Sequence, residues 1–326
     1  MVYFGEQCSV EISIVEDMKQ WAYDILTNAG FNNVSLEQAL HQYCNMKLRL
    51  LAPKPRQVLV SKELTCPDKC KDGYAYFKRA VEEGRQLLPF MSKMILDADS
   101  RIDKMVFDWG FFHFHLNTAP DKKDPRFIER ADDLLIAYVD AYHDDKMYFL
   151  QIRPHIKSIW TEQELVRILA DNWPETMERY RVKGAAALTE NVRDNDYRIA
   201  RDNNICTFVD LHDGRVFIGP NLGLNSAGTS ARASVNYNHI CNNAVLFEKT
   251  MGDAVDDIVR LINKKLDVPA SIVKLRLVEP GDKDYLFKVE PYGFLLRFII
   301  TEDRTFMAVG DNANEIEEAI RQRNAV

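Results

Sequence analysis

The stretch Trp109-Gly-Phe-Phe-His-Phe-His-Leu-Asn-Thr118 decides the fold of the middle of the chain. On a β-strand, successive side chains point to opposite faces, so His113 and His115 would share one face. The other face would carry Phe112, Phe114 and Leu116. This alternation predicts a sheet with an apolar inner face and a polar working face.

Two more runs rich in aromatic and branched residues follow this stretch. Met105–Asn117, Asp133–Val139 and Lys146–Arg153 are separated by polar connections, which predicts three strands in an antiparallel meander. The turn from His143 to Lys146 would join the last two strands as a hairpin.

The rest of the chain mixes helical and strand patterns, so we predict an α+β protein. A helical N-terminal region would pack on the central antiparallel sheet module, and a second α+β domain would follow. The expected helices before the sheet are 16–28, a helix from Ser35 to Pro53, and 74–96, with a strand at 56–64. Beyond the sheet we expect a helix from Thr161, a hairpin of 206–210 and 215–218, a helical region at 229–266, strands at 272–278, 285–289, 294–300 and 305–309, and a last helix at 312–323.

These patterns predict four segments along the chain. They are a helical N-terminal region at 1–103, a sheet module with the candidate site at 104–175, a charged junction at 176–204 and a C-terminal α+β domain at 205–326.

Composition limits the classes of function. The chain has 326 residues and a net charge of -7, which disfavours unspecific nucleic-acid binding because that binding depends on Lys and Arg. Its six cysteines are scattered, as in reduced intracellular proteins. The N-terminus lacks the features of a secretory signal, and no apolar run is long enough to span a bilayer, so we expect a cytoplasmic protein without a membrane partner.

The candidate catalytic residues are His113, His115, Arg130 and His155. Arg130 stands just before the second strand and His155 just after the third, so a meander would bring both beside the two strand histidines. One imidazole could take the proton from a 2′-hydroxyl while another protonates the leaving oxygen. Arg130, Arg126 or Arg153 would hold the phosphate, and no metal or cofactor would be needed.

This arrangement resembles RelE-type toxins, which belong to the wider barnase, EndoU and colicin-like ribonuclease group. The resemblance covers 104–173 and is carried by the His-x-His strand, by Arg130-Ala-Asp-Asp-Leu-Leu-Ile-Ala-Tyr138 and by Tyr148-Phe-Leu-Gln-Ile-Arg-Pro-His155. It implies that His113, His115, Arg130 and His155 are the catalytic positions of a toxin or defence effector. It also implies RNA, often ribosome-bound, as the substrate and an inhibitory antitoxin protein as a partner. Toxins of this type are usually small and basic, whereas this stretch is acidic and lies in a longer chain.

Two other classes of function remain open. The protein could be a non-enzymatic interaction or regulatory protein, with Arg130 paired to Asp132 or Asp133 and the histidines facing solvent. It could also be a metal-dependent hydrolase, because His113 and His115 with Asp108 or His155 could bind zinc.

A glycine-rich loop forms the second feature of interest. The segment from Gly219 to Ser230 follows a strand and precedes a helix, so backbone N–H groups near Gly223, Gly228 and Thr229 could bind a phosphate. A structural turn in which Thr229 or Ser230 caps the helix is the alternative.

Overall fold

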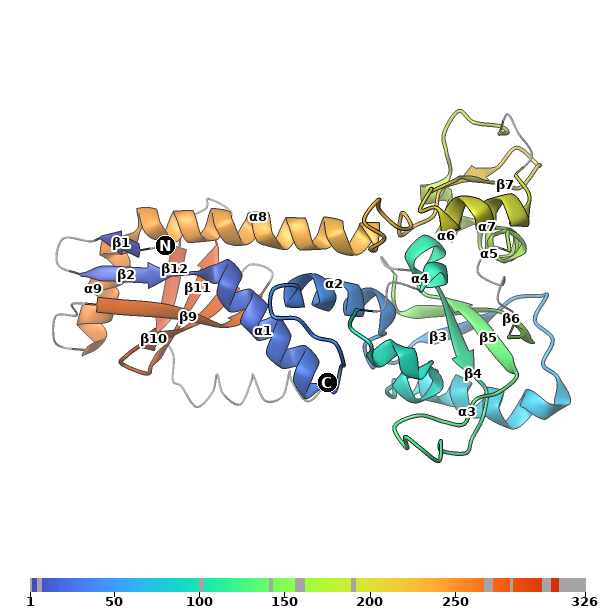
Figure 1. Ribbon diagram of the computed structural model, residues 1–326, viewed down its shortest axis with the longest axis horizontal. Coiled ribbons are helices and arrows are strands. Elements are labelled where there is room, and N and C mark those ends of the chain that lie inside the picture. Colours follow the sequence, from blue (N-terminus) through green and yellow to red (C-terminus); the bar gives the residue numbers. More distant parts are fainter. Residues whose placement is uncertain are drawn as a thin grey trace. The chain divides into compact units, whose positions relative to one another are not determined.

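The computed structural model describes residues 2–4, 8–99, 103–140, 143–155, 162–188, 192–266, 272–281, 284–300 and 306–310. The chain forms two compact units (Figure 1). Unit 1 combines Met1–Tyr43 with Asn236–Val326, and unit 2 is Cys44–Val235. Helices and open mixed sheets occur together, so the predicted α+β class is confirmed.

The sheet of unit 1 joins the two ends of the chain. Its six strands have the order β1-β2-β9-β10-β11-β12. β2 pairs with β9 in parallel, with Val10 opposite Val273, while the other neighbours are antiparallel. The strands are β1 (Val2–Phe4), β2 (Ser9–Ile12), β9 (Ile272–Pro280), β10 (Asp284–Glu290), β11 (Leu295–Ile300) and β12 (Phe306–Gly310). The predicted C-terminal strands are therefore present, but N-terminal residues complete their sheet.

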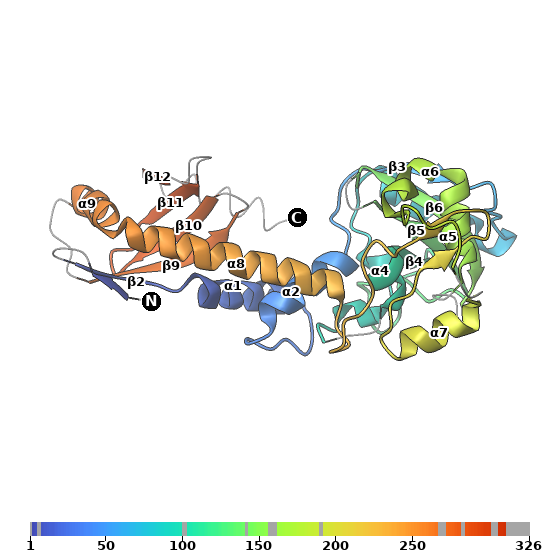
Figure 2. The ribbon, with the colours of Figure 1, turned by 90° about the horizontal axis from the view of Figure 1, so that it is seen from above.

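Helices as well as strands contribute to the core of unit 1. α1 (Ile14–Asn28), α8 (Ala231–Asp253) and α9 (Val255–Leu266) share one buried apolar cluster with the strands. Figure 2 shows α8 running beside β9 and β10. The buried Glu248 carboxylate of α8 accepts the Ile14 N–H at 3.0 Å, so a distant side chain satisfies a free backbone donor at the start of α1.

The central sheet of unit 2 has the order β3-β6-β5-β4. β4 (Phe111–His115), β5 (Asp133–Tyr138) and β6 (Lys146–Pro154) are antiparallel neighbours, which confirms the predicted meander. β3 (Gln57–Val60) adds a parallel strand beside β6. β4 consequently lies at one edge of the sheet.

Each face of this sheet is covered. On one face, Phe77 of α3 (Lys71–Glu82) packs its ring 4.5 Å from that of Phe114 and 5.6 Å from that of Phe149. On the other, α5 (Glu164–Asn172) belongs to a buried cluster with Leu134 and other strand residues. The face that carries the histidines is therefore largely apolar, and our prediction of a polar working face was wrong.

Several predicted elements are shorter than expected. The predicted strand at Met105–Asn117 is in fact a helix, α4 (Lys104–Trp109), followed by β4. The Asp103 side chain accepts the Val106 N–H at the start of α4, and Gly110 with φ 71° ends it. The predicted helix at 74–96 ends with α3, because Gly84 adopts φ 72°. Two 3-10 turns follow at Leu88–Phe90 and Lys93–Leu96.

The predicted boundaries between segments also differ from the observed units. The predicted charged junction lies inside unit 2, where α7 (Asp194–Asp202) buries Tyr197 and Arg201. The helical region at 229–266 divides into α8 and α9, and the last predicted helix, 312–323, lies outside the described residues. The remaining elements are α2 (Ala39–Arg49), Asp68–Cys70, α6 (Pro174–Met177), Glu178–Tyr180, β7 (Val209–Asp210) and β8 (Val216–Phe217). β7 and β8 form the expected hairpin.

Candidate functional site

The register of the central sheet aligns the ends of three strands. His115 of β4 lies opposite Leu134 of β5, and Leu134 lies opposite Arg153 of β6. Just beyond, the His155 N–H donates to the Asp132 carbonyl oxygen at 2.8 Å. His155 therefore stays beside the segment that leads into β5, as the meander predicted.

His115 is the buried member of the group. Its side chain is 4% exposed, and its Nδ1 accepts the Ala131 N–H at 3.3 Å. Burial, and after it electrostatic repulsion from His113, Arg130 and His155, lowers the pKa of His115 to about 4. Near neutral pH the ring is therefore uncharged, with its proton on Nε2.

The four predicted catalytic residues are close enough to interact electrostatically. His113, Arg130 and His155 each influence the pKa of the His115 imidazole, so the four residues share one electrostatic neighbourhood near the end of β4. His113 is half-buried, whereas Arg130 and His155 are exposed. The group thus combines one buried imidazole, that of His115, with the accessible side chains of Arg130 and His155.

The three candidate phosphate-binding arginines differ in their partners. Arg126 is bound to Asp124, with its Nη2 2.9 Å from Oδ2, and Arg153 is ion-paired with Glu162. Within the described ranges, no carboxylate pairs with Arg130. Asp133, one partner considered for Arg130, forms its ion pair with Lys69 instead. Arg130 is therefore the arginine of the three that is available to an incoming anion.

Two polar residues near the histidines were not assigned a role from the sequence. Glu162 has only the pattern of a first-turn helix residue, yet it neutralises Arg153. Gln151 lies on the cross-strand row of His113 and Ile136, and its buried Oε1 has no hydrogen-bond partner among the described residues. Parity along β6 places Gln151 on this face, but sequence alone gives no sign that its acceptor is free.

The glycine-rich loop does not offer free donors at the predicted positions. The Gly223 N–H donates to the Phe107 carbonyl oxygen at 2.9 Å, and the N–H groups of Gly228 and Thr229 donate to Asn225. Ser230 caps α8, since its Oγ accepts the Ala233 N–H. These contacts support the structural interpretation of the loop, because the N–H groups of Gly223, Gly228 and Thr229 already donate to protein acceptors and are not available to a phosphate.

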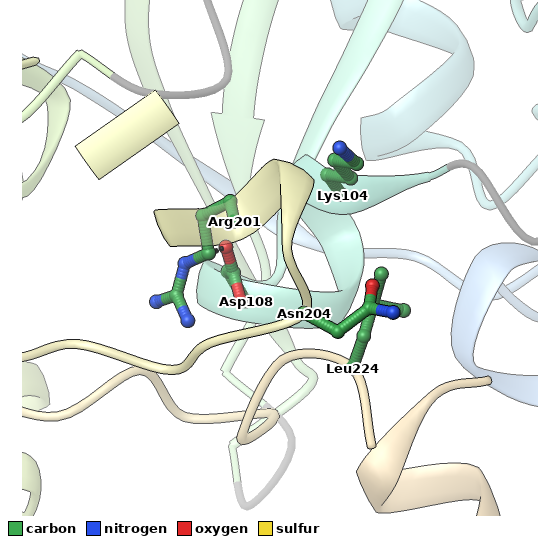
Figure 3. Close-up of a pocket in the computed structure, with 5 residues that line it drawn as sticks. All are labelled: Lys104, Asp108, Arg201, Asn204 and Leu224. Atoms are coloured by element: carbon green, nitrogen blue, oxygen red, sulfur yellow. Dashed lines mark ion pairs between the residues drawn. The ribbon is translucent and has the colours of Figure 1, made fainter. Parts of the chain in front are cut away.

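Asp108 belongs to a separate buried ion pair. Its Oδ2 lies 2.8 Å from Arg201 Nε, and both side chains are at most 4% exposed (Figure 3). The small cavity beside them, about 10 Å³, has room for one water at most. Asp108 precedes β4 while His115 ends it, roughly 14 Å further along a strand of this length. Asp108 is therefore not in position to join His115 around one metal ion.

The described part of the chain contains no group of three or more His, Cys, Asp or Glu residues arranged to hold a metal ion. Nor does it contain a helix long and apolar enough to cross a membrane. Comparison with protein-family models, with curated proteins and with solved structures finds no match to this chain.

Proposed function

We propose that this protein is a metal-independent ribonuclease-type effector whose site is formed by His113, His115, Arg130 and His155. One observation carries the proposal: the sheet register aligns His115 with the strand ends next to Arg130 and His155, and the buried His115 imidazole lies within electrostatic reach of the other three residues. Histidines beside an unpaired arginine supply what phosphodiester cleavage needs without a metal, namely a proton acceptor, a proton donor and a stabilising positive charge.

The burial of His115 divides the roles among the histidines. With a pKa of about 4, His115 holds no extra proton to give near neutral pH, so acid–base catalysis falls to His113 and His155. One of them removes the proton of a ribose 2′-hydroxyl, whose oxygen attacks the phosphorus. The other gives a proton to the 5′-oxygen as the bond between phosphorus and that oxygen breaks. His115 can donate a hydrogen bond from Nε2 to a phosphate oxygen, as a neutral group.

Arg130 supplies the charge in an otherwise acidic protein. A net charge of -7 gives little general attraction to RNA, so binding depends on local cations. Arg130 is exposed and free of carboxylate partners among the described residues, and a guanidinium matches phosphate in two-point hydrogen bonding. RNA that is already held on a carrier such as the ribosome would meet this site most readily.

The test compares wild type with His113→Ala, His155→Ala and Arg130→Ala, expressed in cells from an inducible promoter. Wild type should arrest growth and break down RNA, and each substitution should remove both effects. His143→Ala is the matched control, because His143 is exposed in the β5–β6 turn, away from His115. Circular dichroism melts verify that each variant is folded. Equal, harmless behaviour of all proteins would favour the non-enzymatic interaction protein.

A second experiment tests the mechanism with purified protein and a short RNA. Cleavage should persist in EDTA and should stop when the 2′-hydroxyls are methylated, because the attacking oxygen is then blocked. Loss of cleavage in EDTA would favour the metal-dependent alternative. Cleavage of the methylated RNA would contradict the proposed attack by the 2′-oxygen.

A further inference from the structure

A cavity of about 260 Å³ lies in unit 2, beside the start of β4. It reaches Gly110 and Phe112 at that end of the strand, whereas His115 is at the other end. The volume is many times the roughly 10–15 Å³ that one water needs, and it is slightly below the range usual for drug-sized ligands. The cavity therefore suits a compact ring system.

Aromatic and aliphatic side chains form its walls. Phe112, Tyr138 and Tyr180 line the cavity and are at most 9% exposed, and Leu48 and Leu51 add aliphatic surface. Gly110, with φ 71°, leaves space between two lining residues. A Cβ at this position would lie 3.4 Å from the Tyr138 ring and 3.5 Å from Asn221 Nδ2. Such walls favour a flat aromatic group that can stack.

Tyr138 brings a buried donor to the cavity. The residue is 1% exposed, and its hydroxyl lies close to the Tyr180 side chain without meeting any described residue in good hydrogen-bond geometry. Burial, and after it the nearby Tyr180, raises the pKa of Tyr138 well above its usual range, so the phenol keeps its proton. A buried hydroxyl without a well-aligned partner is costly, so a ligand acceptor at this point would stabilise it.

Asn221 offers the complementary group. Its Nδ2 donates to the Val106 carbonyl oxygen at 2.6 Å, and this fixes the orientation of the amide. The Oδ1 atom is then an acceptor on a residue that lines the same cavity. A phenol donor and an amide acceptor among the lining residues match a base edge with an acceptor next to a donor, such as the ring nitrogen and amino group of adenine or cytosine.

Lys47 adds a positive charge to the lining. It is exposed, and no carboxylate pairs with it in the described part of the chain. Arg56 also lines the cavity, but its Nε, Nη1 and Nη2 donate to the carbonyl oxygens of Asp144, Lys54 and Ala52. Lys47 is thus the cation available to an anionic group attached to the ring.

We propose that this cavity binds one nucleotide whose base has an amidine edge, adenine or cytosine, with the base among Phe112, Tyr138 and Tyr180 and the phosphate at Lys47. The nucleotide could be free or part of an RNA chain, since both present the same base and phosphate. The proposal uses no residue of the histidine group, so it can succeed or fail independently of the proposed ribonuclease function.

The test is calorimetric titration of the full chain with AMP, adenosine and UMP. AMP should bind. UMP should bind at least tenfold more weakly, because uracil N3 carries a hydrogen and cannot accept one from the Tyr138 hydroxyl. Adenosine should bind more weakly than AMP, because it has no phosphate for Lys47 to bind. Tyr138→Phe should weaken AMP about tenfold, the usual effect of one lost hydrogen bond, without lowering the melting temperature. Tyr148→Phe is the matched control, since Tyr148 lies opposite Tyr138 in the sheet and does not line the cavity.

Lys47→Met tests the binding of the phosphate separately from the binding of the base. It should weaken AMP and leave adenosine unchanged. An oligoadenylate that binds more tightly than AMP would identify an RNA segment as the source, whereas equal affinities would identify a free nucleotide. The proposal is overturned if neither AMP, CMP nor the oligonucleotide binds, or if Tyr138→Phe and Tyr148→Phe bind AMP as wild type does.

Discussion

Replacement of Arg201 by Met should destabilise unit 2 by an amount that depends on pH. Arg201 Nε lies 2.8 Å from the Asp108 carboxylate, and Nη2 donates to the Tyr197 hydroxyl at 2.8 Å. Nη1 donates to the Ile205 carbonyl oxygen at 3.2 Å. The substitution removes these contacts and leaves the buried Asp108 without its counter-ion, so two contributions have to be separated.

The first contribution does not depend on pH between 5 and 8. Two hydrogen bonds from a charged donor are lost at buried or partly buried partners, at about 1.5–3 kcal/mol each, which costs about 3–6 kcal/mol in total. The second contribution comes from Asp108, whose pKa burial raises to about 6 in the wild type despite Arg201. Without Arg201 the pKa of Asp108 rises further. The folded variant then avoids an unpaired buried charge only if the Asp108 carboxylate binds a proton.

The sign and limit of this second contribution follow from proton binding. At pH 5 Asp108 is already largely protonated in the folded wild type, so loss of Arg201 adds little electrostatic cost. At pH 8 the wild-type carboxylate is ionised, and protonating it in the variant costs at most two pH units at about 1.36 kcal/mol each, about 2.7 kcal/mol. The total destabilisation should therefore be about 3–6 kcal/mol at pH 5 and rise to about 6–9 kcal/mol at pH 8.

Urea unfolding at both pH values, followed by circular dichroism, measures the difference directly. Arg198→Met is the matched control, because Arg198 lies on the same helix but its ion pair with Asp202 is exposed, so its loss should cost under about 1 kcal/mol. An equal destabilisation by Arg201→Met at pH 5 and pH 8 would refute the reasoning, since it would mean that Asp108 does not change its protonation in this range.

Three further outcomes are expected. The His115 ring should remain neutral down to pH about 4 in an NMR titration. Because the unfolded state binds a proton on this ring at a higher pH than the folded state does, the free energy of unfolding should fall by about 3 kcal/mol as the pH drops from 6.5 to 4. His115→Gln should make that decrease smaller. Phe77→Ala should cost about 3–5 kcal/mol in urea unfolding, because the ring is fully buried against Phe90, Phe114 and Phe149, and a normal midpoint would contradict this packing. Glu248→Ala should cost about 1–3 kcal/mol by leaving the Ile14 N–H without its acceptor, and Glu248→Gln should recover part of that loss.

The central meander could be predicted from the sequence because its information is local. Alternation in Phe111–His115 assigns faces to side chains, and antiparallel neighbours with short connections fix which strand ends meet. The positions of Arg130 and His155 follow from that register. Their closeness to His115 needed no knowledge of distant segments, whereas their role in catalysis stays a prediction.

Other features depend on contacts that no local pattern shows. The apolar run of α4 fits a strand as well as a helix, and Asp103 and Gly110 decide the matter by capping it. The pairing of β2 with β9 joins residues that are more than two hundred positions apart. Likewise, the glycine-rich loop has the composition of an anion site, yet protein acceptors already bind its N–H groups at the predicted positions.

The two ends of β4 are held in different ways, and this separates the two proposed sites. At the His115 end, sheet register and the Ala131 N–H position the group. At the Gly110 end, the Asn221 N–H donates to the Asp108 carbonyl oxygen at 3.1 Å, and a Cβ on Gly219 would lie only 2.6 Å from that oxygen. The loop that supplies Asn221 to the cavity therefore packs directly on α4, next to the Asp108–Arg201 pair. We therefore expect loss of that ion pair to disturb the cavity before it disturbs the histidine group, which the sheet register holds.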